Sequence, residues 1–159
     1  MGYRRTKAKV NIGSVAPDFT LPSQSGEMVS LKNFLGKRPV VLFFYPKDNT
    51  LGCTKEVCSF RDSYEELRNL DAGVIGISSD SVDSHKGFAE KHKLPFTLLS
   101  DEGGKVRSLY GVPKTWGIFA GRVTYVIDEE RVVRNVFSSQ MEVEKHVEEA
   151  LNTLRSIGT

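Results

Sequence analysis

The segment from Pro39 to Tyr45 is an unbroken run of apolar and aromatic residues, and it constrains the fold more than any other part of the chain. A strand with water on one face alternates apolar and polar residues, whereas a strand covered on both faces does not. The run therefore predicts a central strand with other structure packed on both sides. It is far shorter than the ~18 apolar residues of a membrane span, so we expect no transmembrane segment and no membrane partner.

Shorter patterns predict the order of the other elements. In chain order the elements are a small hairpin over 15–31, the strand over 39–45, a helix from about 52 to 70, a strand over 74–77, a helix through 88–92, a strand over 96–99, a short helix over 106–110, a hairpin of strands 123–127 and 132–137, and a helix over 143–154. Strands and helices alternate first, and the chain closes with strand, strand, helix. We therefore expect an α/β, thioredoxin-like fold with an N-terminal β-hairpin and a central mixed β-sheet flanked by helices, parallel in the middle and antiparallel at the last hairpin.

The 159 residues include 22 Lys and Arg against 20 Asp and Glu, but the charge is unevenly spread. Arg4, Arg5, Lys7 and Lys9 stand near the N-terminus without an acid, so the rest of the chain has two more acidic than basic side chains. We expect a disordered basic tail over 1–10, a single domain over 11–159 and no nucleic-acid partner.

The cysteine content bears on the compartment. Two cysteines in a chain of this length do not form a secreted disulfide framework. No apolar segment of the signal-peptide type follows the basic residues. We expect a reducing compartment and reactive thiols. The expected location is cytoplasmic, or organellar for a mature chain whose targeting peptide has been removed.

Cys53 lies where the predicted central strand leads into the first long helix, at the edge of an α/β sheet where ligands bind. Thr50 is a good N-cap residue, which makes Cys53 the third residue of the helix. The free N–H groups and the helix dipole favour a negative charge there, so we expect a reactive thiolate at Cys53. The alternative is structural: Cys53 continues the apolar stripe of Val57 and Phe60 and packs as a small hydrophobic residue.

Cys58 follows Cys53 by five residues. On an α-helix that spacing separates the two Cα atoms by about 8.7 Å, whereas a disulfide usually needs about 4.4–6.8 Å. The two thiols cannot bond while the helix is intact, so a reaction between them requires the first turns to unwind. The alternative for Cys58 is a free thiol on the flank of a helix.

The three histidines, His85, His92 and His146, are scattered through the chain, and we expect each to be a solvated helix residue. Two cysteines five residues apart and scattered histidines do not make the four-ligand set of a zinc site. A glycine-rich phosphate loop and a serine-nucleophile elbow are also missing. We therefore expect no metal and no cofactor.

Pro46, Thr50 and Cys53 match the peroxiredoxin active-site pattern of proline, three residues, Thr or Ser, two residues, and cysteine. The fuller segment from Phe44 to Cys58 resembles the peroxiredoxin Q subfamily, also called the bacterioferritin comigratory proteins. Further blocks that resemble strands of the family, in the family's order, are 16–19, 76–80, 98–101 and 121–128. The resemblance thus covers nearly the whole chain.

The resemblance implies a cofactor-free, thiol-dependent peroxidase that reduces hydrogen peroxide and organic hydroperoxides. Cys53 matches the peroxidatic cysteine, whose thiolate attacks the peroxide and becomes a sulfenic acid. Cys58 matches the resolving cysteine, which would form an intramolecular disulfide that a thioredoxin-like or glutaredoxin-like donor reduces. The subfamily also implies a monomer.

The resemblance extends to the surroundings of Cys53. Thr50 and Arg122 match the residues that hydrogen-bond the thiolate and the peroxide oxygens. Pro46 matches the residue that shields the cysteine from water, and Glu56 stands where the wider family often has an acid that orients the arginine. Leu51 departs from the proline that is usual in the subfamily, which should loosen the loop or ease the unwinding of the helix.

Two other functions remain open from the residues. A thiol–disulfide oxidoreductase acting on protein disulfides would use the same thiols, although its usual Cys-x-x-Cys spacing is absent. A non-enzymatic redox-sensing or chaperone-like binding module would use the opening of the helix to expose Val57 and Phe60.

Overall fold

The computed structural model describes residues 10–34, 37–112, 114–115 and 119–157. Its strands are β1 (Thr20–Pro22), β2 (Met28–Ser30), β3 (Val40–Phe44), β4 (Gly73–Ser78), β5 (Thr97–Ser100), β6 (Lys114–Thr115), β7 (Phe119–Ala120), β8 (Val123–Ile127) and β9 (Val133–Ser138). Its helices are the 3-10 turn η1 (Leu31–Asn33), α1 (Leu51–Asp62), α2 (Tyr64–Asn69), α3 (Val82–His92), α4 (Lys105–Tyr110) and α5 (Lys145–Ile157). Of these helices, none is long and apolar enough to cross a bilayer.

The main sheet has the strand order β5-β4-β3-β8-β9. β3 pairs in parallel with β4, and β4 with β5, whereas β8 and β9 are antiparallel to their neighbours. All five residues of β3 are buried, as the apolar run predicts. The mixed thioredoxin-like sheet, the N-terminal hairpin of β1 and β2, and the final hairpin of β8 and β9 are therefore confirmed.

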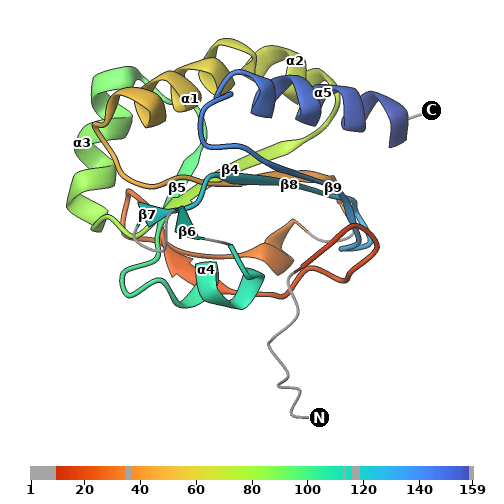
Figure 1. The fold of residues 1–159 in the computed structure, drawn as a ribbon, viewed down its shortest axis with the longest axis horizontal. Helices are drawn as coiled ribbons and strands as arrows, with labels where there is room; N and C mark the ends of the chain where they lie inside the picture. The colour runs from red at the N-terminus through yellow and green to blue at the C-terminus, as the bar shows by residue number, and fades with distance from the viewer. Residues whose placement is uncertain (1–9, 35–36, 113, 116–118, 158–159) are drawn as a thin grey trace.

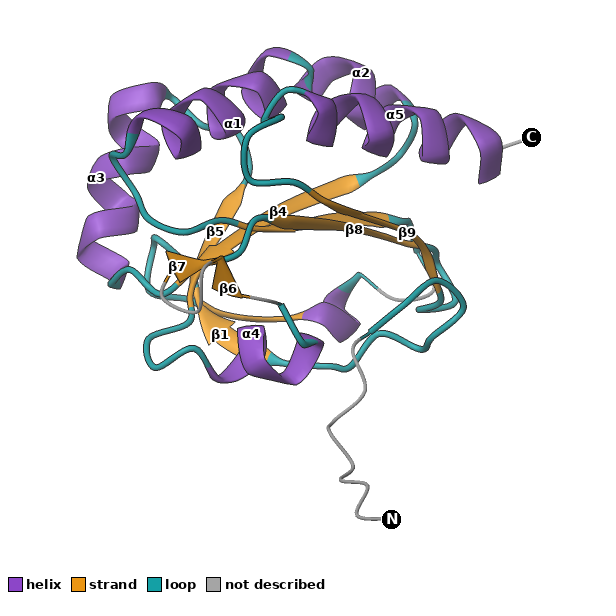
Figure 2. Cartoon of the chain, in the orientation of Figure 1, coloured by secondary structure: helices purple, strands orange, loops and turns teal. Residues whose placement is uncertain are grey.

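Each face of the sheet carries its own hydrophobic cluster. Helices α1, α2, α3 and α5 cover one face, and the hairpin of β1 and β2, η1 and α4 cover the other (Figures 1 and 2). Successive side chains of β3 point to opposite faces, so Phe43 packs under the four helices and Phe44 packs against Tyr110 on the other side. Two covered faces explain why β3 has no polar position.

The long helix predicted over 52–70 is two helices, so that prediction is wrong in its extent. Ser63, with φ −100° and ψ 7°, ends α1 and begins α2. Serine is weak inside helices because its hydroxyl competes for local backbone hydrogen bonds, and this favours helix ends. The short pair β6 and β7 was not anticipated either.

The predicted basic tail falls mostly outside the described residues, which begin at Val10. Val10 itself is buried, and its N–H donates a hydrogen bond to the carbonyl of Tyr110 at 3.2 Å. Val10 therefore packs with the body of the fold, and the basic tail stays a prediction for the residues before it.

Candidate active site

Cys53 is the third residue of α1, just beyond the carboxyl end of β3. Thr50 precedes the helix in an extended conformation, with φ −92° and ψ 155°, so it is the N-cap residue by backbone geometry. Its side chain does not cap the helix, contrary to the expectation, because its hydroxyl donates to the Lys47 carbonyl at 2.8 Å. The N–H groups of the first turn therefore keep their capacity to stabilise an anion.

Arg122 stands immediately before β8 and reaches the start of α1. Its Nη1 donates to Glu56 Oε1 at 2.7 Å, and its Nε donates to the Gln140 carbonyl at 3.2 Å. Burial lowers the pKa of Arg122, but the negative charges of Glu56 and Cys53 raise it by more, so the net shift is upward. Arg122 is a permanent cation held against the thiol.

Gly52 makes the approach of the arginine possible. A Cβ atom at this position would lie 3.1 Å from Arg122 Nη2, closer than an ordinary van der Waals contact. A larger residue would push the guanidinium away from the thiol of Cys53. The glycine next to Cys53 therefore has a steric role that the sequence pattern alone did not identify.

Glu56 is completely buried one turn after Cys53. Burial raises its pKa to about 7, and the guanidinium of Arg122 opposes that rise. In the described part of the chain its second oxygen, Oε2, has no hydrogen-bond partner and lies 3.6 Å from His146 Nδ1. Glu56 therefore lies beside Arg122, as the sequence analysis expected.

His146 is a residue of the site that the sequence analysis misassigned as solvated. Its side chain is fully buried, its Nε2 lies 2.8 Å from the Ser139 carbonyl, and its Nδ1 lies 2.7 Å from Thr124 Oγ1. A carbonyl only accepts, so Nε2 carries the proton. Burial lowers the pKa of His146 to about 4, so Nδ1 is an acceptor for the Thr124 hydroxyl at neutral pH.

A signal for this burial was present in the sequence. His146 falls between Val143 and Val147 on the apolar stripe of the last helix, and His85 is likewise three residues before Phe88. Both histidines have no exposed surface, so the prediction that they are solvated is wrong. Helical periodicity places them inward because residues three and four apart share one face of a helix.

Cys58 lies on the same unbroken helix as Cys53, and both thiols are free. Cys53 is buried, and Cys58 is half-buried with its Sγ 3.7 Å from His92 Nδ1. The helix is continuous through both cysteines, so the separation of about 8.7 Å set by helix geometry applies. Burial, followed by the charges of Lys91 and Arg61, lowers the pKa of His92.

The loop that leads to the helix is open to solvent on one side. Pro46 is half-buried, and Thr50 and Leu51 are exposed, with Leu51 at 89%. The expected contacts of Thr50 with a peroxide and of Pro46 as a shield remain predictions. The exposed side of this loop offers a route by which a small substrate reaches the start of α1.

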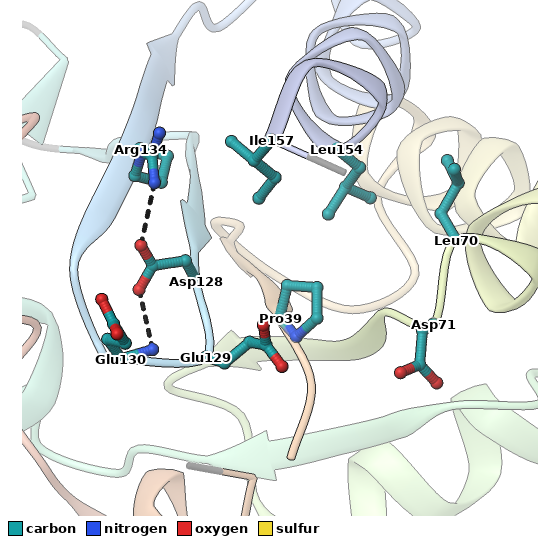
Figure 3. Close-up of a pocket in the computed structure, with 9 residues that line it drawn as sticks. All are labelled: Pro39, Leu70, Asp71, Asp128, Glu129, Glu130, Arg134, Leu154 and Ile157. Atoms are coloured by element: carbon teal, nitrogen blue, oxygen red, sulfur yellow. Dashed lines mark hydrogen bonds and ion pairs between the residues drawn. The ribbon is translucent and has the colours of Figure 1, made fainter. Parts of the chain in front are cut away.

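A cavity of about 390 Å³ lies away from Cys53. It is lined by Pro39, which precedes β3, by Leu154 and Ile157 of α5, and by acidic residues of the β8–β9 turn (Figure 3). Cys53 follows β3, so the two places lie at opposite ends of that strand. The cavity holds neither thiol and takes no part in the chemistry of Cys53.

Comparison with known proteins agrees with the geometry. Residues 12–136 match the model of the AhpC/TSA family. The chain is 56% identical over 151 residues to the chloroplastic peroxiredoxin Q of Sedum lineare, covering 94% of this chain and 81% of that protein. That relative and further peroxiredoxin Q proteins from Populus jackii and Arabidopsis thaliana are described as chloroplastic, so the comparisons point to an organelle and do not support the cytoplasmic expectation.

Solved structures give the same result. Peroxidoxin BcpB of Mycobacterium tuberculosis superposes with a TM-score of 0.87 at 42% identity, covering 93% of this chain and 98% of that one. The bacterioferritin comigratory protein of Xanthomonas campestris, whose structure addresses alkyl peroxide reduction, has a TM-score of 0.83 at 27% identity, covering 94% and 98%. The chain therefore belongs to the AhpC/TSA family, as a peroxiredoxin of the Q type and a thiol-dependent peroxidase.

Proposed function

We propose that Cys53 is the peroxidatic cysteine of this enzyme. Its thiolate attacks one peroxide oxygen, the O–O bond breaks, the sulfur is oxidised to a sulfenic acid, and the other oxygen leaves as water or an alcohol after taking a proton. Arg122 stabilises the thiolate and the charge that develops on the leaving oxygen. The observation that carries the proposal is Cys53 on the first turn of α1 with the guanidinium of Arg122 beside it, against Gly52 and close enough for the charge of Cys53 to raise the pKa of the arginine.

The substrates proposed are hydrogen peroxide and organic hydroperoxides. The Xanthomonas campestris relative is described by its alkyl peroxide reduction activity. In this chain the exposed Leu51 adds an apolar side chain next to the start of α1, where the alkyl group of a hydroperoxide would lie. Thr50 is proposed to accept a hydrogen bond from the peroxide, since its own hydroxyl proton is used on the Lys47 carbonyl.

Cys58 is proposed to resolve the sulfenic acid. Its thiol loses a proton and attacks the sulfur of Cys53, which releases water and forms an intramolecular disulfide. The first turns of α1 unwind to bring the two sulfurs together. His92 Nδ1, 3.7 Å from Cys58 Sγ, is placed to accept the thiol proton, and its lowered pKa keeps the ring neutral at pH 7.

A thioredoxin-like or glutaredoxin-like donor is proposed to reduce the disulfide, and the enzyme is proposed to act as a monomer. An organellar location is proposed over a cytoplasmic one, because the similar peroxiredoxin Q relatives are chloroplastic. Imaging of the protein fused at its C-terminus to a fluorescent protein tests the location, and gel filtration with light scattering tests the oligomeric state.

The decisive experiment is the intact mass of the reduced protein before and after one equivalent of hydrogen peroxide, with alkylation of free thiols. Loss of two hydrogens and of both alkylation sites is expected. Persistence of both free thiols would overturn the proposal. The Cys53→Ser variant should lose sustained turnover with a thioredoxin-type donor, and wild-type protein should be nearly inert in insulin-disulfide reduction.

A further inference from the structure

A buried polar cluster lies beneath the loop that carries Thr50 and leads to Cys53, outside the groups used above. Asp48 is 4% exposed, and its carboxylate accepts three hydrogen bonds. The hydroxyl of Tyr45 reaches Oδ1 at 2.5 Å, and Ser84 Oγ and His85 Nδ1 reach Oδ2 at 2.8 Å and 2.7 Å. The loop is thereby tied to α3 and to Tyr45, the residue that directly follows β3.

The protonation of His85 follows from its partners. Nδ1 faces the carboxylate of Asp48, and Nε2 faces the carbonyl of Leu99 at 2.9 Å. Both partners are acceptors, so the pair holds a proton on each ring nitrogen or shares one with the carboxylate. In either form Asp48 and His85 make a fully buried, charge-compensated pair.

Asp48, Asp80 and His85 bring three potential ligand atoms within 4.8 Å of one another. In this structure those atoms are engaged in hydrogen bonds with one another and with neighbouring groups. The cluster therefore acts as a hydrogen-bonded anchor.

The backbone of the loop is held as well. The N–H of Asp48 donates to Asp80 Oδ2 at 2.8 Å, and Ser78 Oγ donates to the same oxygen at 2.5 Å. The next residue, Asn49, has φ 63°, a left-handed conformation that turns the chain into α1. The anchor thus ends one residue before the turn and two residues before the N-cap residue Thr50.

We propose that Tyr45, Asp48 and His85 are positioning residues that hold the folded start of α1 and set how readily it unwinds. The inference rests on the proposed function, since unwinding is the step that joins Cys53 to Cys58. Weakening the anchor shifts the population toward the unwound form. Peroxide then reacts more slowly, and a larger share of the sulfenic acid becomes disulfide before a second peroxide over-oxidises it.

The chain offers a matched pair of variants for the test. Tyr45→Phe removes the hydroxyl that donates to Asp48. Tyr110→Phe removes another buried tyrosine hydroxyl, which donates to the Pro17 carbonyl on the opposite face of the sheet. Each variant loses a buried hydroxyl with its hydrogen bonds and keeps the aromatic ring. Only the first touches the anchor.

Two quantities are measured in each protein: the rate constant for the reaction of Cys53 with hydrogen peroxide, and the ratio of disulfide to sulfinic acid by mass across graded peroxide. Tyr45→Phe is expected to lower the rate constant for hydrogen peroxide. It is also expected to raise the ratio of disulfide to sulfinic acid by about tenfold, which is the effect of one hydrogen bond to a charged group. Tyr110→Phe is expected to lower the melting temperature and leave the ratio unchanged. Equal ratios in wild type and Tyr45→Phe, or equal shifts in both variants, would overturn the inference.

A second comparison removes charge. His85→Leu leaves the carboxylate of Asp48 buried without its cation, and should shift the ratio further than Tyr45→Phe. In Asp48→Asn the amide can donate to a neutral His85, so the shift should be smaller than in His85→Leu. The reverse order contradicts the inference. Absence of any disulfide in the wild type would instead refute the resolving role of Cys58.

Discussion

Glu56 Oε1 and Arg122 Nη1 form an ion pair of 2.7 Å with both side chains buried, although the residues are 66 positions apart in the chain. The pair joins the first turns of α1 to the start of β8. Since Glu56 and the Gln140 carbonyl already hold the guanidinium, its rotamer is set before any peroxide arrives. Such fixed donors stabilise developing charge without reorganisation during the reaction.

Replacing Arg122 by Met should lower the rate constant for hydrogen peroxide by about 10²–10³-fold, the usual loss when one preorganised donor is removed. Stopped-flow peroxide competition measures it. Because the change strands the buried Glu56, the Arg122→Met/Glu56→Gln double variant is measured beside it. Arg134→Met, which removes the partner of Asp128 at the far end of β3, is the control and should react as wild type. A wild-type rate in both Arg122 variants would remove the arginine from the mechanism.

Replacing Cys58 by Ser should leave the first reaction intact and block resolution. The sulfenic acid of Cys53 should persist, react with a dimedone-type probe, and pass to sulfinic acid at high peroxide. Mass spectrometry of the labelled protein measures each form. An intramolecular disulfide mass in this variant would contradict the resolving role.

Replacing His92 by Phe should slow disulfide formation by up to about 10²-fold, the lower end of what a general base contributes. In the wild type the step should slow as pH falls and His92 becomes protonated. Lys91→Met keeps the imidazole but removes a charge that lowers the pKa of His92. The pKa of His92 should rise in this variant, so the fall in the rate of disulfide formation at low pH should begin at a higher pH. Rapid acid quench with mass analysis follows the step, and unchanged rates in His92→Phe would exclude the histidine.

The pair Glu56 and His146 should give opposite slopes in the pH dependence of stability. The folded pKa of Glu56 is raised from 4.5 to about 7, so the folded state holds a proton that the unfolded state loses, and this contribution falls as pH rises. The folded pKa of His146 is lowered from 6.5 to about 4, so its contribution is lost as pH falls through that window.

Single variants separate the two slopes. Glu56→Gln should gain stability with rising pH more steeply than wild type, because only His146 then titrates. His146→Gln should lose stability as pH rises between about 4.5 and 7. Urea-denaturation midpoints across this window measure both, and parallel curves for all three proteins would contradict the assigned shifts.

Replacing Leu51 by Pro should stabilise the start of α1 and slow the formation of the disulfide. Leu51 is the first helical residue, and Thr50 already has the extended backbone that a following proline requires. Proline at a compatible position adds about 0.4–1 kcal/mol of stability by restricting the unfolded chain. Leu51→Ala removes the side chain without restricting φ and serves as the control. A faster disulfide in Leu51→Pro would contradict the role given to this position.

Local sequence patterns determined the order of the elements, the buried strand β3, and the place of Cys53 on the first turn of α1. Each depends on residues within one or two turns of each other, where periodicity and capping preferences act. The same range made Thr50 the N-cap candidate, whereas the roles predicted for Pro46 and Cys58 came from the family resemblance. Local patterns did not predict the break at Ser63 between α1 and α2, because a break of one residue hardly changes the spacing of the apolar residues.

Only the tertiary structure decided which distant groups meet. The partner of Glu56 stands immediately before β8, the partner of His146 lies in β8, and the partner of Asp48 lies in α3. No local window contains both members of these pairs, and their protonation depends on burial that only packing creates. The sequence by itself therefore determined the place of Cys53 on the first turn of its helix, whereas long-range packing decided the charges and protons that surround it.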